Sequence, residues 1–231
     1  MAKAKNTGAT SEDKNARLFA LVNAAMGDAG ILAWDDKYDY DVWRPVVGVR
    51  EHDGAMGPMA PTPGDTLAAE CDPDWRPLGA PDSNNKGGLD FTPPFPAYPS
   101  GHATFGAAAL HMIRLFYGKL PGDISPDAIY KGPFISEELN GKTTDSHGVV
   151  RAAHSRKFAG GLWQMIVENG FSRVFLGVHW YFDAFALKPN KTAPDLSKFI
   201  GGVPLGLKIA EDIWAFGNQK GPKKSIAGPR L

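Results

Sequence analysis

The spacing of apolar residues between Arg17 and Arg44 is the feature that most constrains the fold. Apolar side chains recur there about every 3.6 residues, which predicts one long amphipathic helix. The inward stripe comprises Leu18, Leu21, Val22, Ala25, Ala29, Leu32 and Ala33. Pro45 is expected to end this helix because proline has no N–H to donate.

The same periodicity recurs along the rest of the chain. It predicts helices over about 101–117, 150–169 and 203–217, and short helical pieces at 125–130 and 135–141. No strand pattern of any length competes with them. The sequence therefore predicts an all-α helical bundle with long irregular loops.

One globular domain is expected, because 231 residues of which 43% are hydrophobic can bury a substantial core. We expect it to span residues 17–216, between a disordered leader at 1–16 and a flexible tail at 217–231. Residues 49–99 form a long loop rich in Gly, Pro, Asp and Asn. Loops of this length are usually functional or disordered.

The charge balance excludes several classes of partner. With 25 basic and 25 acidic residues, the chain has no general affinity for nucleic acid or anionic membranes. Cys71 is the only cysteine, which excludes an internal disulfide and a cysteine-based zinc site. No apolar run reaches the roughly 18 residues of a membrane span. The polar N-terminus shows no secretory signal, so we expect a soluble protein of unassigned compartment.

Lys37 and Arg44 are the first candidate site residues. They are seven positions apart, so a helix reaching Pro45 would place both cations on one face. Taken alone, they could equally be a solvated basic pair. Their neighbours are bulky, and cations among such side chains are costly to bury unless an anion neutralises them. These neighbours are Trp34, Tyr38, Tyr40, Trp43, Val46 and Val47.

Ser100, Gly101 and His102 follow Pro99 at the point where a loop is expected to become a helix. Ser100 is a suitable N-cap, and Gly101 leaves room for a ligand beside the backbone. The unpaired N–H groups and the dipole of a helix start favour a bound anion. The alternative is a plain capped helix with an incidental histidine.

Arg173, His179 and Asp183 form the third candidate group. If residues 179–183 are helical, Asp183 can hold one imidazole nitrogen of His179 and fix its tautomer. The forked guanidinium of Arg173 suits two oxygens of a tetrahedral anion, but a bend near Gly177 is needed to bring it to His179. The alternative is a core histidine and a surface arginine.

Together these segments resemble the signature shared by vanadium-dependent haloperoxidases and the type 2 phosphatidic acid phosphatase superfamily. In this sequence the signature reads Lys37-x6-Arg44-Pro45, Pro99-Ser100-Gly101-His102 and Ser172-Arg173-x3-Gly177-x-His179-x3-Asp183. Longer stretches such as "FSRVFLGVHWYFDA" are similar to the C-terminal half of the chloroperoxidase branch. The likeness runs from about Arg17 to Trp214, and it implies the helical bundle of that branch.

The resemblance implies orthovanadate as the prosthetic group, at a site that phosphate could also occupy. His179 would be the covalent protein ligand of vanadium, with Asp183 behind it. His102 would hydrogen-bond the apical oxygen and act as the acid–base group for peroxide. The vanadate oxygens would be held by Lys37, Arg44, Ser100, Gly101 and Arg173. Of all these residues, His102, His179 and Lys37 would be the catalytic ones.

The implied reaction is the oxidation of halide by hydrogen peroxide to hypohalous acid, which halogenates small organic acceptors. Phe95 and Trp34 match aromatic positions beside the vanadate. In algal bromoperoxidases the position of Phe95 is usually histidine, so Phe95 favours chloride as well as bromide. The alternative is that the two rings simply pack under the loop.

Two other functions stay open. A phosphatase of the same superfamily would use His179 as nucleophile and His102 to protonate the leaving group. A non-catalytic relative or inactive fragment would only bind anions. Family haloperoxidases usually carry a first helical bundle ahead of this part, which would supply an acidic partner for Arg173. We therefore expect self-association, or a partner that supplies this bundle.

Overall fold

The computed structural model describes residues 10–50, 72, 74–79, 91–145, 147–189 and 193–217. Its elements are α1 (Ser11–Tyr40), α2 (Pro45–Arg50), α3 (Gly101–Phe116), α4 (Gly161–Phe175), α5 (Tyr181–Ala184) and α6 (Gly202–Gly217), a 3-10 helix at Glu137–Leu139, and the strands β1 (Ala186–Leu187) and β2 (Pro194–Asp195). The two strands pair antiparallel over two residues each. The architecture is a helical bundle, which confirms the predicted all-α class.

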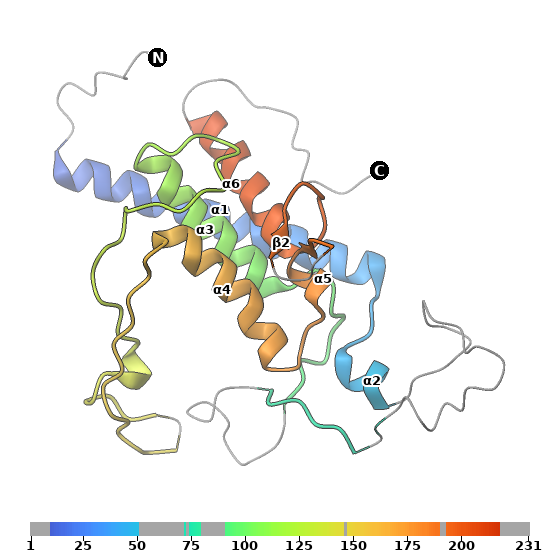
Figure 1. Ribbon diagram of the computed structural model, residues 1–231. Helices are drawn as coiled ribbons and strands as arrows, with labels where there is room; N and C mark the ends of the chain where they lie inside the picture. Colours follow the sequence, from blue (N-terminus) through green and yellow to red (C-terminus); the bar gives the residue numbers. More distant parts are fainter. Residues whose placement is uncertain are drawn as a thin grey trace.

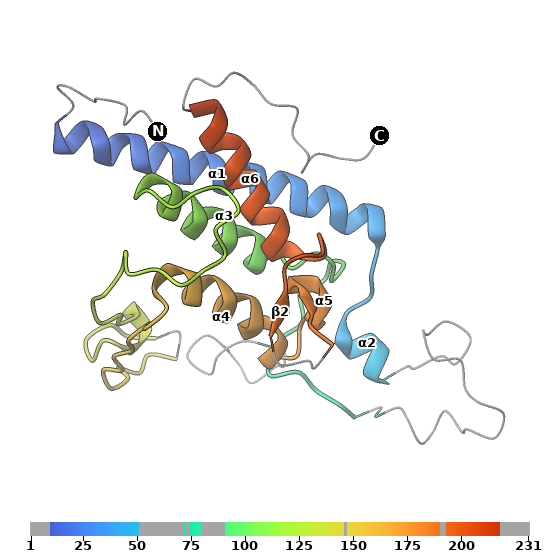
Figure 2. The same ribbon diagram turned by 45° about the horizontal axis from the view of Figure 1, so that its top comes forward.

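Helix α3 lies at the centre of the bundle. It packs against α1, α4 and α6, as both ribbon views show (Figure 1, Figure 2). Small side chains make this possible, since Ala103, Ala107 and Ala108 of α3 are completely buried. The inward stripe predicted for α1 is confirmed at Ala25, Ala29 and Ala33, which are also completely buried. The functional residues at the start of α3 therefore rest on a densely covered helix.

Glycines let α6 approach α3 closely. A Cβ added to Gly202 would lie 2.4 Å from the carbonyl oxygen of Ser100. A Cβ on Gly206 would lie 2.3 Å from the carbonyl oxygen of Thr104. Any larger residue would push the two helices apart, so these glycines set the distance between α6 and the first turns of α3.

Two predicted helix starts and one predicted helical piece were wrong. Helix α1 begins at Ser11, inside the expected leader, because Thr10 and Asp13 form a capping box there. Helix α4 begins at Gly161 rather than near residue 150. Residues 125–130 are not helical. The short helical piece predicted at 135–141 is present as the 3-10 helix.

Side-chain chemistry explains the late start of α4. The Asp127 carboxylate accepts hydrogen bonds from the N–H groups of Leu162 and Trp163, and so caps the helix from outside. The residues before α4 belong to an arm, residues 131–158, that projects from the bundle (Figure 1). Two isolated bridges, Phe134 with Arg156 and Thr144 with Val150, join its two sides.

The segment Ser11–Arg50 is long and apolar enough to cross a membrane by length and composition, with a mean hydropathy of 1.3 over its best window. This differs from the expectation that no run would be long enough. Core helices pass the same test, and α1 packs on α3 and α6. Cys71, most of loop 49–99, residues 1–9 and residues 218–231 lie outside the described residues.

Candidate anion-binding site

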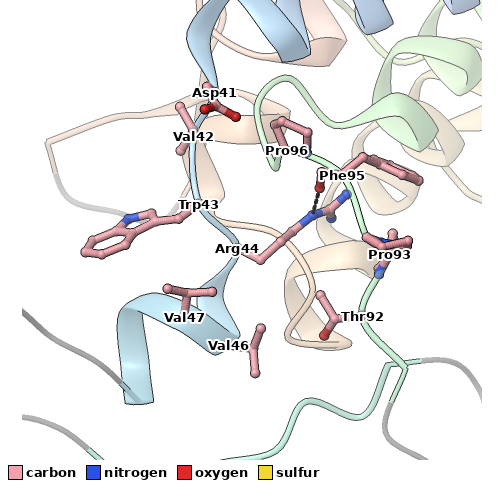
Figure 3. A pocket seen from close by; sticks show the side chains of 11 residues that line it. Asp41, Val42, Trp43, Arg44, Val46, Val47, Thr92, Pro93, Phe95 and Pro96 are labelled. Atoms are coloured by element: carbon pink, nitrogen blue, oxygen red, sulfur yellow. Dashed lines mark hydrogen bonds between the residues drawn. The ribbon is translucent and has the colours of Figure 1, made fainter.

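Arg44 lies outside α1, so the prediction that Lys37 and Arg44 share one helical face was wrong. Helix α1 ends at Tyr40, where Asp41 adopts a left-handed conformation (φ 47°) and its N–H bonds the carbonyl of Lys37. Pro45 begins α2 instead of ending α1, because a first-turn residue needs no N–H. The extended residues between the helices direct Arg44 toward the residue 92–96 segment (Figure 3).

Lys37 is completely buried and holds the loop that precedes α3. Its Nζ donates to the carbonyl oxygens of Pro96 (2.9 Å), Ala97 (2.9 Å) and Pro99 (2.6 Å). Burial, together with the nearby charge of Arg44, lowers the pKa of Lys37 to about 7, although the charge of Asp183 opposes this change. At neutral pH the Lys37 side chain is therefore only partly protonated, and a nearby negative charge would favour its charged form.

Arg44 connects the first segment to the third. Its Nε donates to the carbonyl of Phe95 (2.8 Å, Figure 3), and its Nη1 donates to the carbonyl of Val178 (2.7 Å). The same Nη1 lies 3.0 Å from Nε2 of His179. Nη2 is buried and has no hydrogen-bond partner. Both N–H groups of this nitrogen are thus available to a ligand.

The Ser100 side chain caps α3 as predicted. Its Oγ accepts from the N–H of Ala103 (3.4 Å), and the residue is completely buried. The space beside Gly101 is already filled, because a Cβ there would lie 2.8 Å from the Trp34 ring. His102 remains exposed. The protein nevertheless packs around part of the ring, and this desolvation lowers the pKa of His102, as do the charges of Arg173, Lys37 and Arg44.

The predicted bend between Arg173 and His179 is present. Helix α4 ends at Phe175, and Gly177 follows with φ 71°. Arg173 lies close enough to His179 and Arg44 to lower the pKa of both. Its Nε is buried without a hydrogen-bond partner. Arg173 therefore faces the same small region as Arg44.

His179 and Asp183 form the predicted pair, although His179 precedes α5. Nδ1 of His179 lies 2.8 Å from Oδ2 of Asp183, which also accepts the N–H of Trp180. Burial lowers the pKa of His179, as do the charges of Arg44 and Lys37. The neutral ring thus donates a hydrogen bond from Nδ1 to Asp183, and the lone pair of Nε2 faces the cations.

Trp34 and Phe95 form an aromatic wall beside the cations. Their ring centroids lie 5.3 Å apart, and Nζ of Lys37 lies 5.6 Å and 5.5 Å from them. The guanidinium carbon of Arg44 lies 5.0 Å from the Phe95 centroid. These are cation–π distances, so the rings do more than pack under a loop. A pocket of about 550 Å³ opens beside Arg44 and Phe95 (Figure 3).

The residues brought together suit an anion with several charges. Lys37, Arg44 and Arg173 carry positive charge, and none forms an ion pair with a carboxylate within the described ranges. Two buried guanidinium nitrogens, Nη2 of Arg44 and Nε of Arg173, lack hydrogen-bond partners there. Asp183 is the carboxylate that contacts this group, through His179. A bound anion would therefore stabilise the charged forms of these buried side chains.

Some contributors gave no signal in the sequence. The carbonyl groups that hold Lys37 and Arg44 belong to the backbone, so no residue type marks them. Asn169 of α4 donates to the carbonyl of His102 (2.7 Å). No group of three or more His, Cys, Asp or Glu side chains in the part of the chain that the structure describes could hold a metal ion.

Comparison with known proteins identifies the family of the chain. Residues 17–188 match a family model described as the VCPO second helical-bundle domain. Vanadium chloroperoxidase of Curvularia inaequalis is 39% identical over 266 aligned positions, covering 93% of this chain. The chain spans 41% of the length of that relative.

A solved structure, described as the first bacterial vanadium-dependent iodoperoxidase, is 21% identical in sequence to this chain. The match covers 90% of this chain and 34% of the iodoperoxidase chain. The TM-score of this match is 0.49. The family model covers residues 17–188, which is most of the chain. The chain belongs to the vanadium haloperoxidase family and corresponds to the second helical-bundle domain of vanadium chloroperoxidase.

Proposed function

We propose that the protein is a vanadate-dependent haloperoxidase, which uses hydrogen peroxide to oxidise bromide and chloride to hypohalous acid. One observation carries this proposal. Buried cations without carboxylate partners surround a neutral His179, in a chain 39% identical to vanadium chloroperoxidase. A tetrahedral oxoanion with several negative charges supplies the missing charge.

Vanadate fits this set of donors. The residues that would hold its oxygens are Lys37, Arg44, Arg173, Ser100 and the N–H of Gly101. His179 would bind vanadium through Nε2, the nitrogen that Asp183 leaves unprotonated. When bound, vanadate supplies a Lewis acid that activates peroxide toward halide without a change in oxidation state.

His102 is the proposed proton carrier. Its lowered pKa keeps the imidazole neutral at neutral pH, so the ring can accept a proton from incoming hydrogen peroxide. Its exposed position gives it access to solvent and to the reagent. After the halide is oxidised, the same ring returns the proton. Lys37 and Arg44 supply the fixed positive charge that favours oxygen atoms as they gain negative charge.

Trp34 and Phe95 are the proposed halide pocket. The aromatic wall excludes water from one side of the cations, and a weakly hydrated halide suits such a surface. Phe95 places no titratable group there, which supports chloride as a substrate alongside bromide. The products would halogenate small organic acceptors nearby.

Reconstitution with orthovanadate tests the proposal. Purified apoprotein should show bromination that depends on peroxide and bromide only after vanadate is added, with equimolar vanadium retained. Phosphate should compete for the site. Hydrolysis of phosphate esters without bromination would contradict the proposal and favour the phosphatase function.

The substitution His179→Ala distinguishes a vanadate-dependent enzyme from a protein that only binds anions. It should abolish vanadium retention and bromination, because Nε2 of His179 is the proposed ligand. His147→Ala is the matched control, since His147 lies in the projecting arm. Retention of vanadium by the His179→Ala protein would contradict the proposed ligand.

A further inference from the structure

We propose that Asn169 is a positioning residue that sets the place of His102 in the active site. Asn169 lies on α4 and donates from Nδ2 to the carbonyl oxygen of His102, the second residue of α3, at 2.7 Å. The catalytic meaning of this contact rests on the proposed function. The contact itself links the start of α3 to α4.

A helix carbonyl can accept this second hydrogen bond. The carbonyl of residue 102 points along α3 toward residue 106, whose N–H is its partner in a regular helix. A carbonyl oxygen has two lone pairs, so a side chain from a neighbouring helix can use the second. Usually the Cβ atom of the residue four positions on obstructs such an approach.

Gly106 removes that obstruction. A Cβ added at Gly106 would lie 2.2 Å from Nδ2 and 3.0 Å from Cγ of Asn169. Glycine is disfavoured in a helix interior, and no positive φ requires it at this position. The space that it leaves is the space that the Asn169 amide occupies. Gly106 and Asn169 therefore act as one unit.

The contact has a direct effect on the site because of where Asn169 lies on α4. Asn169 and Arg173 are four positions apart, so both project from one face of the helix. That face thus carries an oxoanion-binding cation and also fixes the backbone of His102. The His102 imidazole makes no hydrogen bond to another residue of the described ranges, so its backbone determines its position.

Loss of the Asn169 amide should let His102 move away from the cations while the helices stay folded. For Asn169→Ala we expect kcat for bromination to fall roughly 10- to 100-fold, because small displacements of catalytic groups have effects of this size. Vanadate retention should change less than kcat. The pKa of His102, measured by NMR in the anion-free protein, should rise toward its ordinary value as the ring leaves Arg173, Lys37, Arg44 and the facing His179.

Gly106→Ala tests the same contact with Asn169 intact. The added methyl should displace the amide, lower the melting temperature and reproduce the loss of kcat. In the Asn169→Ala background the same change should raise the melting temperature, because the clash is gone and alanine favours helix. Gly27→Ala in α1 is the matched control, since a Cβ there meets nothing within 4 Å.

Two outcomes would overturn the inference. One is a Gly106→Ala protein as stable as the Gly27→Ala protein with Asn169 in place. The other is an Asn169→Ala protein whose His102 pKa equals that of the unchanged chain. Neither measurement needs halogenation. An unchanged chain without bromination would instead contradict the proposed function, while the melting and NMR results would still decide the contact.

Discussion

At the scale of single residues, the His179 ring is held from both sides. Oδ2 of Asp183 accepts a hydrogen bond from Nδ1 at 2.8 Å, and Nη1 of Arg44 lies 3.0 Å from Nε2. Burial raises the pKa of Asp183, and Lys37, Arg44 and the Trp180 N–H oppose this rise. The hydrogen bond between Asp183 and Nδ1 of His179 fixes the tautomer that leaves Nε2 without a proton.

Asp183→Asn should weaken vanadate binding by roughly 10- to 100-fold, because an amide is a poorer acceptor for the Nδ1 proton of His179. Equilibrium dialysis with vanadium analysis measures the effect. Asp195→Asn is the control, because the Asp195 carboxylate bonds its neighbour Ser197. Equal affinity of the Asp183→Asn and Asp195→Asn proteins would show that Asp183 does not tune the ligand.

Lys37 should make anion binding depend on pH. Without an anion, its pKa is lowered to about 7, so the amine is mostly neutral above that pH. A bound anion favours the charged form, so binding takes up a proton above about pH 7. Affinity should then fall by up to about tenfold per pH unit and should level off below pH ~7.

Tungstate is a suitable probe for this dependence, because it stays a dianion over this range while vanadate and phosphate titrate. Calorimetry at several pH values gives the slope. Lys37→Met should bind more weakly and lose the slope, whereas Lys131→Met on the arm should keep it. An affinity for the unchanged chain that stays constant above pH ~7 would contradict the assignment.

At the scale of elements, α3 is fixed at both ends by polar contacts. Its first turn carries Ser100 and His102, and Arg114 is completely buried near its last turn. Arg114 bonds Asp127 (2.9 Å) and lies 3.1 Å from Nδ1 of His111. Asp127 also caps α4, so one ion pair joins the two helices that bring His102 and Arg173 to the site.

Asp127→Ala should destabilise the protein by about 3–5 kcal/mol, since it removes the cap of α4 and the buried carboxylate nearest to Arg114. Among the described residues, only the partly exposed carboxylate of Asp123, at 3.5 Å, would remain beside Arg114. Urea denaturation measures this free energy. Glu168→Gln removes a partner from the exposed pair with Arg156, and should cost about 1 kcal/mol or less. Similar losses for the two variants would mean that the buried ion pair does not hold α3 to α4.

The helices and the site were predictable to different degrees. Apolar periodicity marks α1, α3 and α6, because each buries one continuous stripe. Apolar periodicity wrongly placed Arg44 on α1, because the periodic pattern does not reveal the left-handed conformation of Asp41 that ends the helix. The Asp127 cap on α4 joins residues 35 and 36 positions apart, so local spacing does not reveal it.

The candidate site residues could be selected together from the sequence because their residue types suit an anion-binding site. Three cations, two histidines and a capped helix start are unusual together in a neutral chain. Their convergence depends on the bend at Gly177 and on backbone carbonyls of residues 95–99. Backbone partners have no residue type to detect. Asn169 was missed because its partner is also a carbonyl.

At the scale of the whole molecule, α1 has a largely uncovered apolar face. Phe19, Ile31 and Tyr38 are each more than 60% exposed. Only 17% of the best apolar window of Ser11–Arg50 is buried. The chain spans 41% of the length of vanadium chloroperoxidase. Residues 17–188 match a family model described as the second helical-bundle domain. Uncovered apolar surface of this kind favours association.

The purified chain should therefore self-associate, and size-exclusion chromatography with light scattering should show species larger than 24.8 kDa. Replacing Phe19 and Ile31 by lysine together should shift the protein toward monomer. Leu120→Lys is the control, because Leu120 is exposed but lies outside α1. A monomeric unchanged chain at micromolar concentration would contradict this expectation.

The arm at residues 131–158 is attached to the bundle at a point that Arg114 and Asp127 already fix. Its length can therefore vary without shifting either helix that it joins. At its tip, Gly148 has open space around it. A reporter domain or a surface-immobilisation tag inserted there would leave the bundle and the candidate site undisturbed, which makes this tip a suitable attachment point.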